Sequence, residues 1–175
     1  MATARVGGTF YLTLLVAVLL TFLVHEAAHW LAGVALGYDM VASLNGAAPR
    51  GGSFLVGRDE FLLTAAGPLI TVVQALLAFH LVRSRKLLPA YAFLFVAWFM
   101  RFAAAFVSLM HPNDEARMSL ALGWGFWTLP AVVVLALLAL TWMASRQLRL
   151  GWKTNAASYL LCSVAFAAVV FLDAR

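Results

Sequence analysis

The fold is decided by an apolar stretch near the N-terminus, TFYLTLLVAVLLTFLVHEAAHWLAGVAL, which occupies residues 9–36. A run of about 20 apolar residues is long enough to cross a lipid bilayer as a helix. Two histidines and one glutamate interrupt this run, as His25, Glu26 and His29. Ionisable side chains inside a membrane helix are costly and usually mark a functional site. The stretch therefore predicts a transmembrane helix that carries such a site.

The composition extends this interpretation to the whole chain of 175 residues. Hydrophobic residues make up 65% and charged residues 11%, whereas a soluble domain averages about half and about a quarter. We therefore predict an all-α integral membrane protein with a single membrane domain over residues 1–175. Hydropathy places five transmembrane helices at roughly 9–36, 61–82, 89–110, 127–145 and 155–173.

The connector at residues 38–60 predicts a short β-hairpin-like loop after the first helix. Its stretches MVASLN and SFLVG are rich in β-forming residues and flank the turn sequence GAAPRGG. The formal charge of +5 is scattered along the chain rather than gathered in a basic stripe. We therefore expect the lipid bilayer, and not nucleic acid, to be a partner of this protein. The pattern does not indicate an oligomeric state.

Counting how often the chain crosses the membrane places the chemically unusual stretches at one end of the bundle. HEAAH lies in the second half of the first helix, and the 38–60 connector follows it. The second helix begins near AAGPL, residues 65–69, and the third ends near HPNDEAR, residues 111–117. All four lie on the side opposite the N-terminus, as one buried site requires. We place this multi-pass protein in a bacterial cell membrane, with its N-terminal side cytoplasmic because lysine and arginine are more frequent there.

The spacing within HEAAH indicates a metal site. His25 and His29 are four residues apart, so a helix presents both imidazoles on one face, where they can share one ion. Glu26 is rotated by about 100° from His25 and flanks that ion. This is the H-E-x-x-H arrangement of two zinc ligands and a general base, in which zinc activates a water and polarises a carbonyl. The alternative is a set of polar residues that hydrogen-bond within the bundle.

A catalytic zinc site needs a third protein ligand. The stretch MHPNDEARMS lies at the right end of the bundle, and Pro112 breaks the helix there. We choose Asp114 as the third ligand, with His111 and Glu115 as alternatives. The same stretch also fits an ordinary polar turn in which Asn113 or Asp114 caps the next helix.

These residues resemble the site-2 protease family of intramembrane zinc metalloproteases. Three features match in chain order: HEAAH in a transmembrane helix, AAGPL as the family's Ala-Gly-Pro element, and an aspartate after the third core helix. The resemblance covers about residues 9–118, and residues 119–175 would be two additional helices. The chain departs from the family at Thr71, where an asparagine is common, and at Glu115, where the aspartate of the family is followed by glycine.

The resemblance implies that His25, His29 and Asp114 hold Zn²⁺ and that Glu26 is the general base. The substrate would be a membrane protein or peptide, cleaved in or near a transmembrane segment. The loop at 38–60 would lie beside the active site, where it could hold an extended peptide by strand addition. A plain surface hairpin is the alternative.

Two rival functions fit parts of the pattern. A non-proteolytic membrane protein with a structural or regulatory metal site would not need Glu26. A small carrier or channel would be expected to show internal repeats or paired broken helices, and we find neither in the sequence. Arg101 lies about ten residues before HPNDEAR, or ~15 Å along a helix, so we expect it to pair with another group of the bundle. The sequence does not identify the substrate.

Overall fold

The structure is a computed structural model that describes residues 6–52 and 57–173. Within them, five helices are long and apolar enough to cross a membrane. They are α1 (Gly8–Ala35), α2 (Gly57–Arg85), α3 (Leu88–Val107), α5 (Thr128–Gln147) and α6 (Trp152–Asp173). The predicted integral membrane fold with five transmembrane helices is therefore confirmed. The division into a core at 9–118 and two additional helices stays a prediction.

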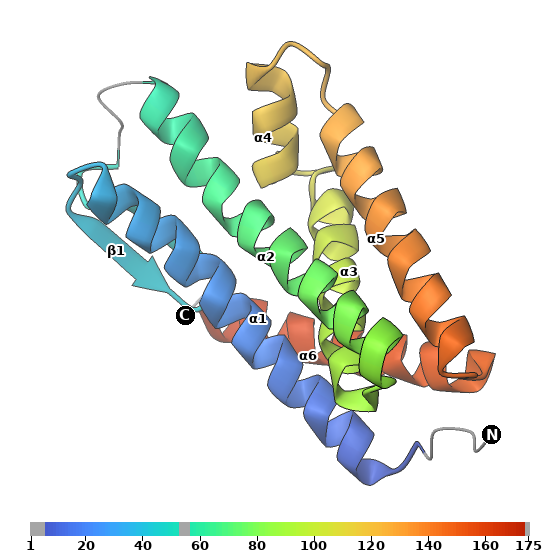
Figure 1. Cartoon of the computed structure of the whole chain (residues 1–175). Helices are drawn as coiled ribbons and strands as arrows, with labels where there is room; N and C mark the ends of the chain where they lie inside the picture. The colour runs from blue at the N-terminus through green and yellow to red at the C-terminus, as the bar shows by residue number, and fades with distance from the viewer. Residues whose placement is uncertain (1–5, 53–56, 174–175) are drawn as a thin grey trace.

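The helices α1, α2 and α3 pack against one another and form the centre of the bundle (Figure 1). α5 packs on α2 and α3, and α6 packs on α1 and α3. Leu14 and Leu94 are fully buried between them, while many leucines of the outer faces are exposed. Tyr91 of α3 donates a hydrogen bond to Asn155 Oδ1 at 2.7 Å, and Asn155 Nδ2 donates to Ser145 Oγ at 2.9 Å. This network ties α3, α5 and α6 together.

Glycine ends the first helix. Gly37 has a φ of +90°, a left-handed conformation that only glycine adopts without strain. The N–H of Tyr38 bonds to the carbonyl of Gly33, and the N–H of Gly37 bonds to that of Val34. These two bonds form a Schellman motif, which satisfies the last carbonyls of the helix. The chain therefore turns sharply at the end of α1 and enters the hairpin beside it.

The predicted hairpin is present, but its second strand was assigned wrongly. β1 (Met40–Ser43) pairs antiparallel with β2 (Gly46–Pro49), with Ser43 opposite Gly46. β2 therefore lies in GAAPRGG, which the glycines and proline led us to interpret as a turn. The turn itself is Leu44–Asn45. Of the stretch SFLVG, residues 53–56 lie outside the described part of the chain.

The far end of α6 holds the hairpin turn in place. The carboxylate of Asp173 accepts hydrogen bonds from Ser43 Oγ at 2.7 Å, Leu44 N at 2.9 Å and Asn45 N at 3.2 Å. The hairpin therefore runs alongside α1 and ends beside the C-terminal end of α6 (Figure 1).

A short polar helix, α4 (Asp114–Ala121), follows α3. The five helices predicted from hydropathy do not include it, because it is short and polar. Asn113 is the N-cap, and its Oδ1 accepts the N–H of Ala116 at 2.9 Å. This bond satisfies one of the free donors at the start of the helix, as asparagine commonly does. The cap fixes the direction in which Asp114, the first helical residue, points.

Candidate metal centre

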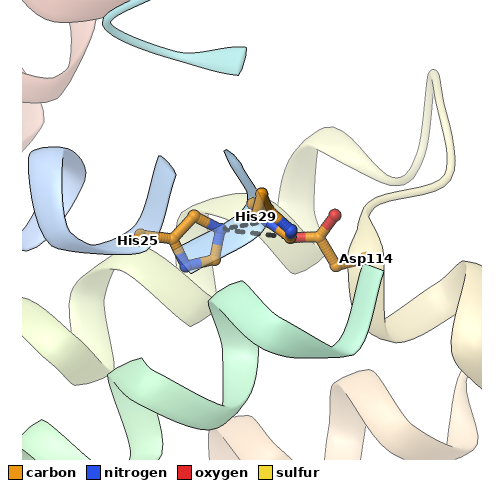
Figure 2. A group of neighbouring side chains, drawn as sticks. All are labelled: His25, His29 and Asp114. Atoms are coloured by element: carbon orange, nitrogen blue, oxygen red, sulfur yellow. Dashed lines mark hydrogen bonds and ion pairs between the residues drawn. The ribbon is translucent and has the colours of Figure 1, made fainter. Parts of the chain in front are cut away.

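Three potential metal ligands meet where α1 approaches the start of α4. His25 and His29 come from successive turns of α1, and Asp114 comes from the first turn of α4. Figure 2 shows the three side chains pointing toward one another. The two Nε2 atoms are 3.1 Å apart, and Asp114 Oδ2 lies 3.2 Å from that of His25 and 3.4 Å from that of His29. Such a group could hold a metal ion.

Residues of α2 form a hydrogen bond with the Nδ1 atom of each imidazole. His29 Nδ1 lies 2.7 Å from the carbonyl oxygen of Leu63, which can only accept, so Nδ1 carries the proton. His25 Nδ1 lies 3.0 Å from Thr71 Oγ1, and that hydroxyl donates its own proton to the Gly67 carbonyl. His25 Nδ1 must therefore be the donor as well. Partners of this kind orient metal-binding histidines and fix their tautomers.

With these tautomers, lone pairs of both Nε2 atoms and of Asp114 Oδ2 are directed at the same point. A neutral imidazole that is protonated at Nδ1 presents a lone pair at Nε2. Both Nε2 atoms and Asp114 Oδ2 are then acceptors, 3.1–3.4 Å from one another. One proton can bridge only two of these atoms, whereas one cation can contact all three. Tetrahedral zinc with bonds of about 2.0–2.1 Å separates its ligand atoms by ~3.3 Å, so the observed spacing fits such an ion.

Gly67 makes this approach of α2 possible. A Cβ at Gly67 would lie 2.5 Å from His25 Cε1 and 2.6 Å from His25 Nε2, and closer still to His29 Nε2. Only glycine therefore leaves room for both imidazoles against the α2 backbone. Pro68, the next residue, lacks an N–H and cannot satisfy the carbonyl of Thr64 one turn earlier. The AAGPL stretch thus supplies both a close contact and an irregular hydrogen-bonding pattern beside the site.

Glu26 opens into a cavity of about 530 Å³. This residue is only 8% exposed, and within the described part of the chain no hydrogen bond or ion pair involves its carboxylate. The cavity is also lined by both histidines, Asp114 and the turn side of the hairpin. Glu26 is therefore available to interact with a molecule that enters the cavity.

Asp114 is held in its charged form. Burial alone would raise the pKa of this carboxyl, but the guanidinium of Arg101, whose Nη1 lies 3.7 Å from Asp114 Oδ2, favours the charged form. The start of α4 adds a favourable interaction, because the N-terminus of a helix carries partial positive charge. Asp114 therefore presents a carboxylate, which is the form that binds cations.

Arg101 contacts this site, and our expectation that it pairs elsewhere was wrong. Its Nη1 donates to Glu115 Oε1 at 3.0 Å and lies 3.7 Å from Asp114 Oδ2, while its Nη2 lies 3.5 Å from His25 Nε2. The estimate of ~15 Å assumed a continuing helix. Instead α3 ends at Val107, and the chain folds back before α4 begins. The separation in sequence therefore led us to overestimate the distance in space between Arg101 and Asp114.

The charges of the site match a divalent cation. Arg101 and Glu115 form a buried ion pair and offset each other. Counted as ionised, Glu26 and Asp114 then contribute two negative charges. Unbalanced charge is costly inside a membrane bundle. A doubly charged cation at the centre of His25, His29 and Asp114 would leave this group of residues neutral.

The other residues predicted for the site have separate positions. His111 lines the cavity but lies outside the three-ligand group, and Glu115 is occupied by Arg101. Asn113 caps α4 and donates to Glu115 Oε2 at 2.8 Å. Thr71 also contacts the site without having been predicted to do so, although its i, i+4 spacing from Gly67 places both on one face of α2.

No protein-family model matches the chain, and searches of curated proteins and of solved structures also found no match. The site therefore has to be interpreted from its own geometry.

Proposed function

We propose that this protein is an intramembrane zinc metalloprotease, similar to the site-2 protease family, in a bacterial cell membrane. One observation carries the proposal: three electron-pair donors, His25, His29 and Asp114, converge beside Glu26, a buried residue whose carboxylate has no partner in residues 6–52 and 57–173. A structural metal site would account for the three ligands alone. The free carboxylate is the part that a hydrolytic reaction requires.

Zinc, when bound, would activate a water molecule and polarise the carbonyl of the scissile peptide. Glu26 takes a proton from the water as the water oxygen forms a bond to the carbonyl carbon. It then gives that proton to the amide nitrogen as the C–N bond breaks. The products are an amine and a carboxylic acid, and the acid releases the second proton of the water when it ionises. Thr71 and Leu63 hold the two imidazoles in the required tautomers throughout.

The cavity beside these residues supports an extended peptide as substrate. Asn45, Gly46 and Ala47 of the hairpin line it together with Phe22 and Phe166. Arg50 N bonds to Asp39 O at 2.8 Å, so pairs along the ladder alternate and Ala42 with Ala47 is a non-bonded pair. The backbone groups of Ala47 therefore point away from β1. A peptide segment unwound from a helix could pair with this edge.

The rival function is a membrane protein whose polar cluster binds no metal or serves only for structure. The 3.5 Å approach of Arg101 to His25 Nε2 favours this rival, because the guanidinium is itself a cation beside the cluster. The two functions differ in metal content and in the need for Glu26.

The first experiment measures the metal content of protein purified without chelators. We expect about one zinc per chain, and near zero in the His25→Ala variant, because two ligands hold a metal ion poorly. His80→Ala is the matched control, since His80 lies near the other end of α2. Metal-free wild-type protein would contradict the proposal.

The second experiment tests Glu26. Glu26→Gln should keep zinc but abolish cleavage, so that a membrane-protein substrate stays bound and can be recovered with the variant. The recovered protein is then incubated with wild-type enzyme and its fragments are identified by mass spectrometry. Glu60→Gln is the control, because Glu60 is a half-exposed acid that pairs with Arg117. Equal turnover by Glu26→Gln and wild type would exclude Glu26 as the base.

A further inference from the structure

Arg101 is a charged residue in the C-terminal third of a membrane helix, and it has access to the candidate site. It belongs to α3, is 2% exposed, and lines the same cavity as Glu26. An arginine at this depth is costly unless it is paired or functional. Replacing a buried ion pair by apolar residues is often neutral or stabilising, so pairing with Glu115 alone does not explain its presence.

The hydrogen-bond donors of Arg101 are only partly used. Nη1 donates to Glu115 at 3.0 Å, but Nε is buried and has no partner within the described residues. Nη2 faces His25 Nε2 at 3.5 Å, which is long for a hydrogen bond. If His25 Nε2 gives its lone pair to a metal ion, Nη2 loses even this acceptor. The guanidinium then has free N–H groups beside the metal ligands.

Glu115 holds the guanidinium in this position. Its Oε1 accepts from Arg101, and its Oε2 accepts from Asn113 Nδ2 at 2.8 Å. Asn113 is fixed in turn by its cap on α4 and by the bond from its N–H to Ser108 Oγ at 3.0 Å. The guanidinium of Arg101 is therefore oriented before any ligand enters the cavity. Such preorganised positive charge stabilises an anion without further rearrangement.

We propose that Arg101 binds the negative charge that develops on the carbonyl oxygen of the substrate during hydrolysis. This role rests on the proposed protease function and makes Arg101 a catalytic residue. As the water oxygen bonds to the carbonyl carbon, the π electron pair moves to the carbonyl oxygen, and Arg101 donates hydrogen bonds to that oxygen. Arginine stays protonated throughout, so Glu26 remains the group that moves the proton.

The test compares an anionic and a neutral ligand at the same metal ion. Cobalt-substituted protein in detergent is titrated with azide and, separately, with imidazole, and the visible cobalt spectrum reports binding. Both probes bind metal, but only azide carries a negative charge. In Arg101→Met we expect azide affinity to fall roughly 10- to 100-fold, the usual loss for a hydrogen bond to a charged group. Imidazole affinity should change less than about twofold, and Arg101→Lys should recover part of the azide affinity.

Two further variants separate the proposal from a structural role. Arg101→Met with Glu115→Gln removes both charges of the pair; the proposal predicts that azide binding stays weak. Recovery to the wild-type level would show that Arg101 only offsets Glu115 and would overturn the proposal. Arg117→Met, which removes a guanidinium that pairs with Glu60 at the same end of the bundle, should leave the ratio of the two affinities unchanged.

The metal content of the wild-type protein and of each variant is measured first. Wild-type protein that binds no cobalt or zinc contradicts the proposed metal centre. Normal metal content in Arg101→Met with unchanged azide affinity contradicts only the role of Arg101. Loss of metal from Arg101→Met and Arg101→Lys alike would show that the guanidinium merely positions α4, and would likewise overturn the proposal.

Discussion

Two of the buried polar networks in the bundle differ in whether donors meet acceptors. In the network of Tyr91, Asn155 and Ser145, each step along the chain of bonds joins a donor to an acceptor. At the candidate metal centre, three acceptors face one another, and the carboxylate of Glu26 has no hydrogen-bond or ion-pair partner among the residues that the structure describes. A satisfied network holds helices together, whereas unsatisfied buried groups need an explanation other than stability. The contrast separates a network that stabilises the bundle from the one at which we propose a metal ion.

The largest effect is expected from Gly67→Ala, which would break the metal centre but not the other network. The new Cβ would collide with the rings of His25 and His29, which are fixed by their outer nitrogens. Zinc content should fall from about one per chain to near zero. Gly33→Ala is the control, because the three atoms nearest to its new Cβ all belong to the flexible side chain of Met40. Normal zinc content in Gly67→Ala would mean that the ligands do not bind where α2 approaches them.

Removing the third ligand is expected to have the next largest effect. Asp114→Ala should weaken zinc binding by more than ~100-fold, because a direct ligand contributes more than the outer partners, whose loss costs about 10- to 100-fold. Competition with a coloured chelator measures the affinity. His111→Ala and Glu115→Ala should each weaken binding less, since neither side chain joins the three-ligand group. A larger loss in His111→Ala would move the third ligand to His111.

Thr71→Val tests whether the hydrogen bond between Thr71 Oγ1 and His25 Nδ1 strengthens zinc binding by His25. Valine keeps the shape but removes the hydroxyl that accepts from His25 Nδ1. Zinc affinity should fall by about 10- to 100-fold while the helices stay packed. Thr21→Val is the matched control, because Thr21 is equally buried in α1 but bonds to Gln74. Equal affinities for the two variants would remove Thr71 from the site.

The smallest effect is expected from a substitution in the network of Tyr91, Asn155 and Ser145, where each bond joins a donor to an acceptor. Tyr91→Phe removes the hydroxyl that donates to Asn155 and should lower the free energy of unfolding by about 0.5–1.5 kcal/mol. Zinc affinity should not change, because this network makes no contact with the ligands. Unfolding in mixed detergent measures the stability. A parallel loss of zinc would show that the two networks are coupled.

Features set by local sequence could be predicted, and features set by packing could not. Hydropathy located all five long helices, and the four-residue spacing placed His25 and His29 on one face. Asp114 was chosen because its stretch ends at the same side of the bundle, and the structure brings it to both histidines. No local pattern reveals that the chain folds back before α4, which is why the contacts of Arg101 were missed.

The hairpin shows a second limit of local patterns. Glycine and proline usually mark turns, yet GAAP forms a strand because its register against β1 provides the partners. Thr71 is a similar case, since a threonine in an apolar helix has no distinguishing signal until Gly67 and His25 are placed beside it. In both cases the information lies in a neighbouring segment of the chain.

The contact between Asp173 and the hairpin turn has a consequence for the order of assembly. The residues it joins are separated by 128 to 130 positions, so the turn can be held only after α6 has been made and packed. Contacts between such distant segments form late, because a long loop must close first. The histidines enter the membrane with the first helix, but the wall that the hairpin adds to the cavity is secured last. A nascent chain would therefore carry His25 and His29 well before the cavity beside them is complete.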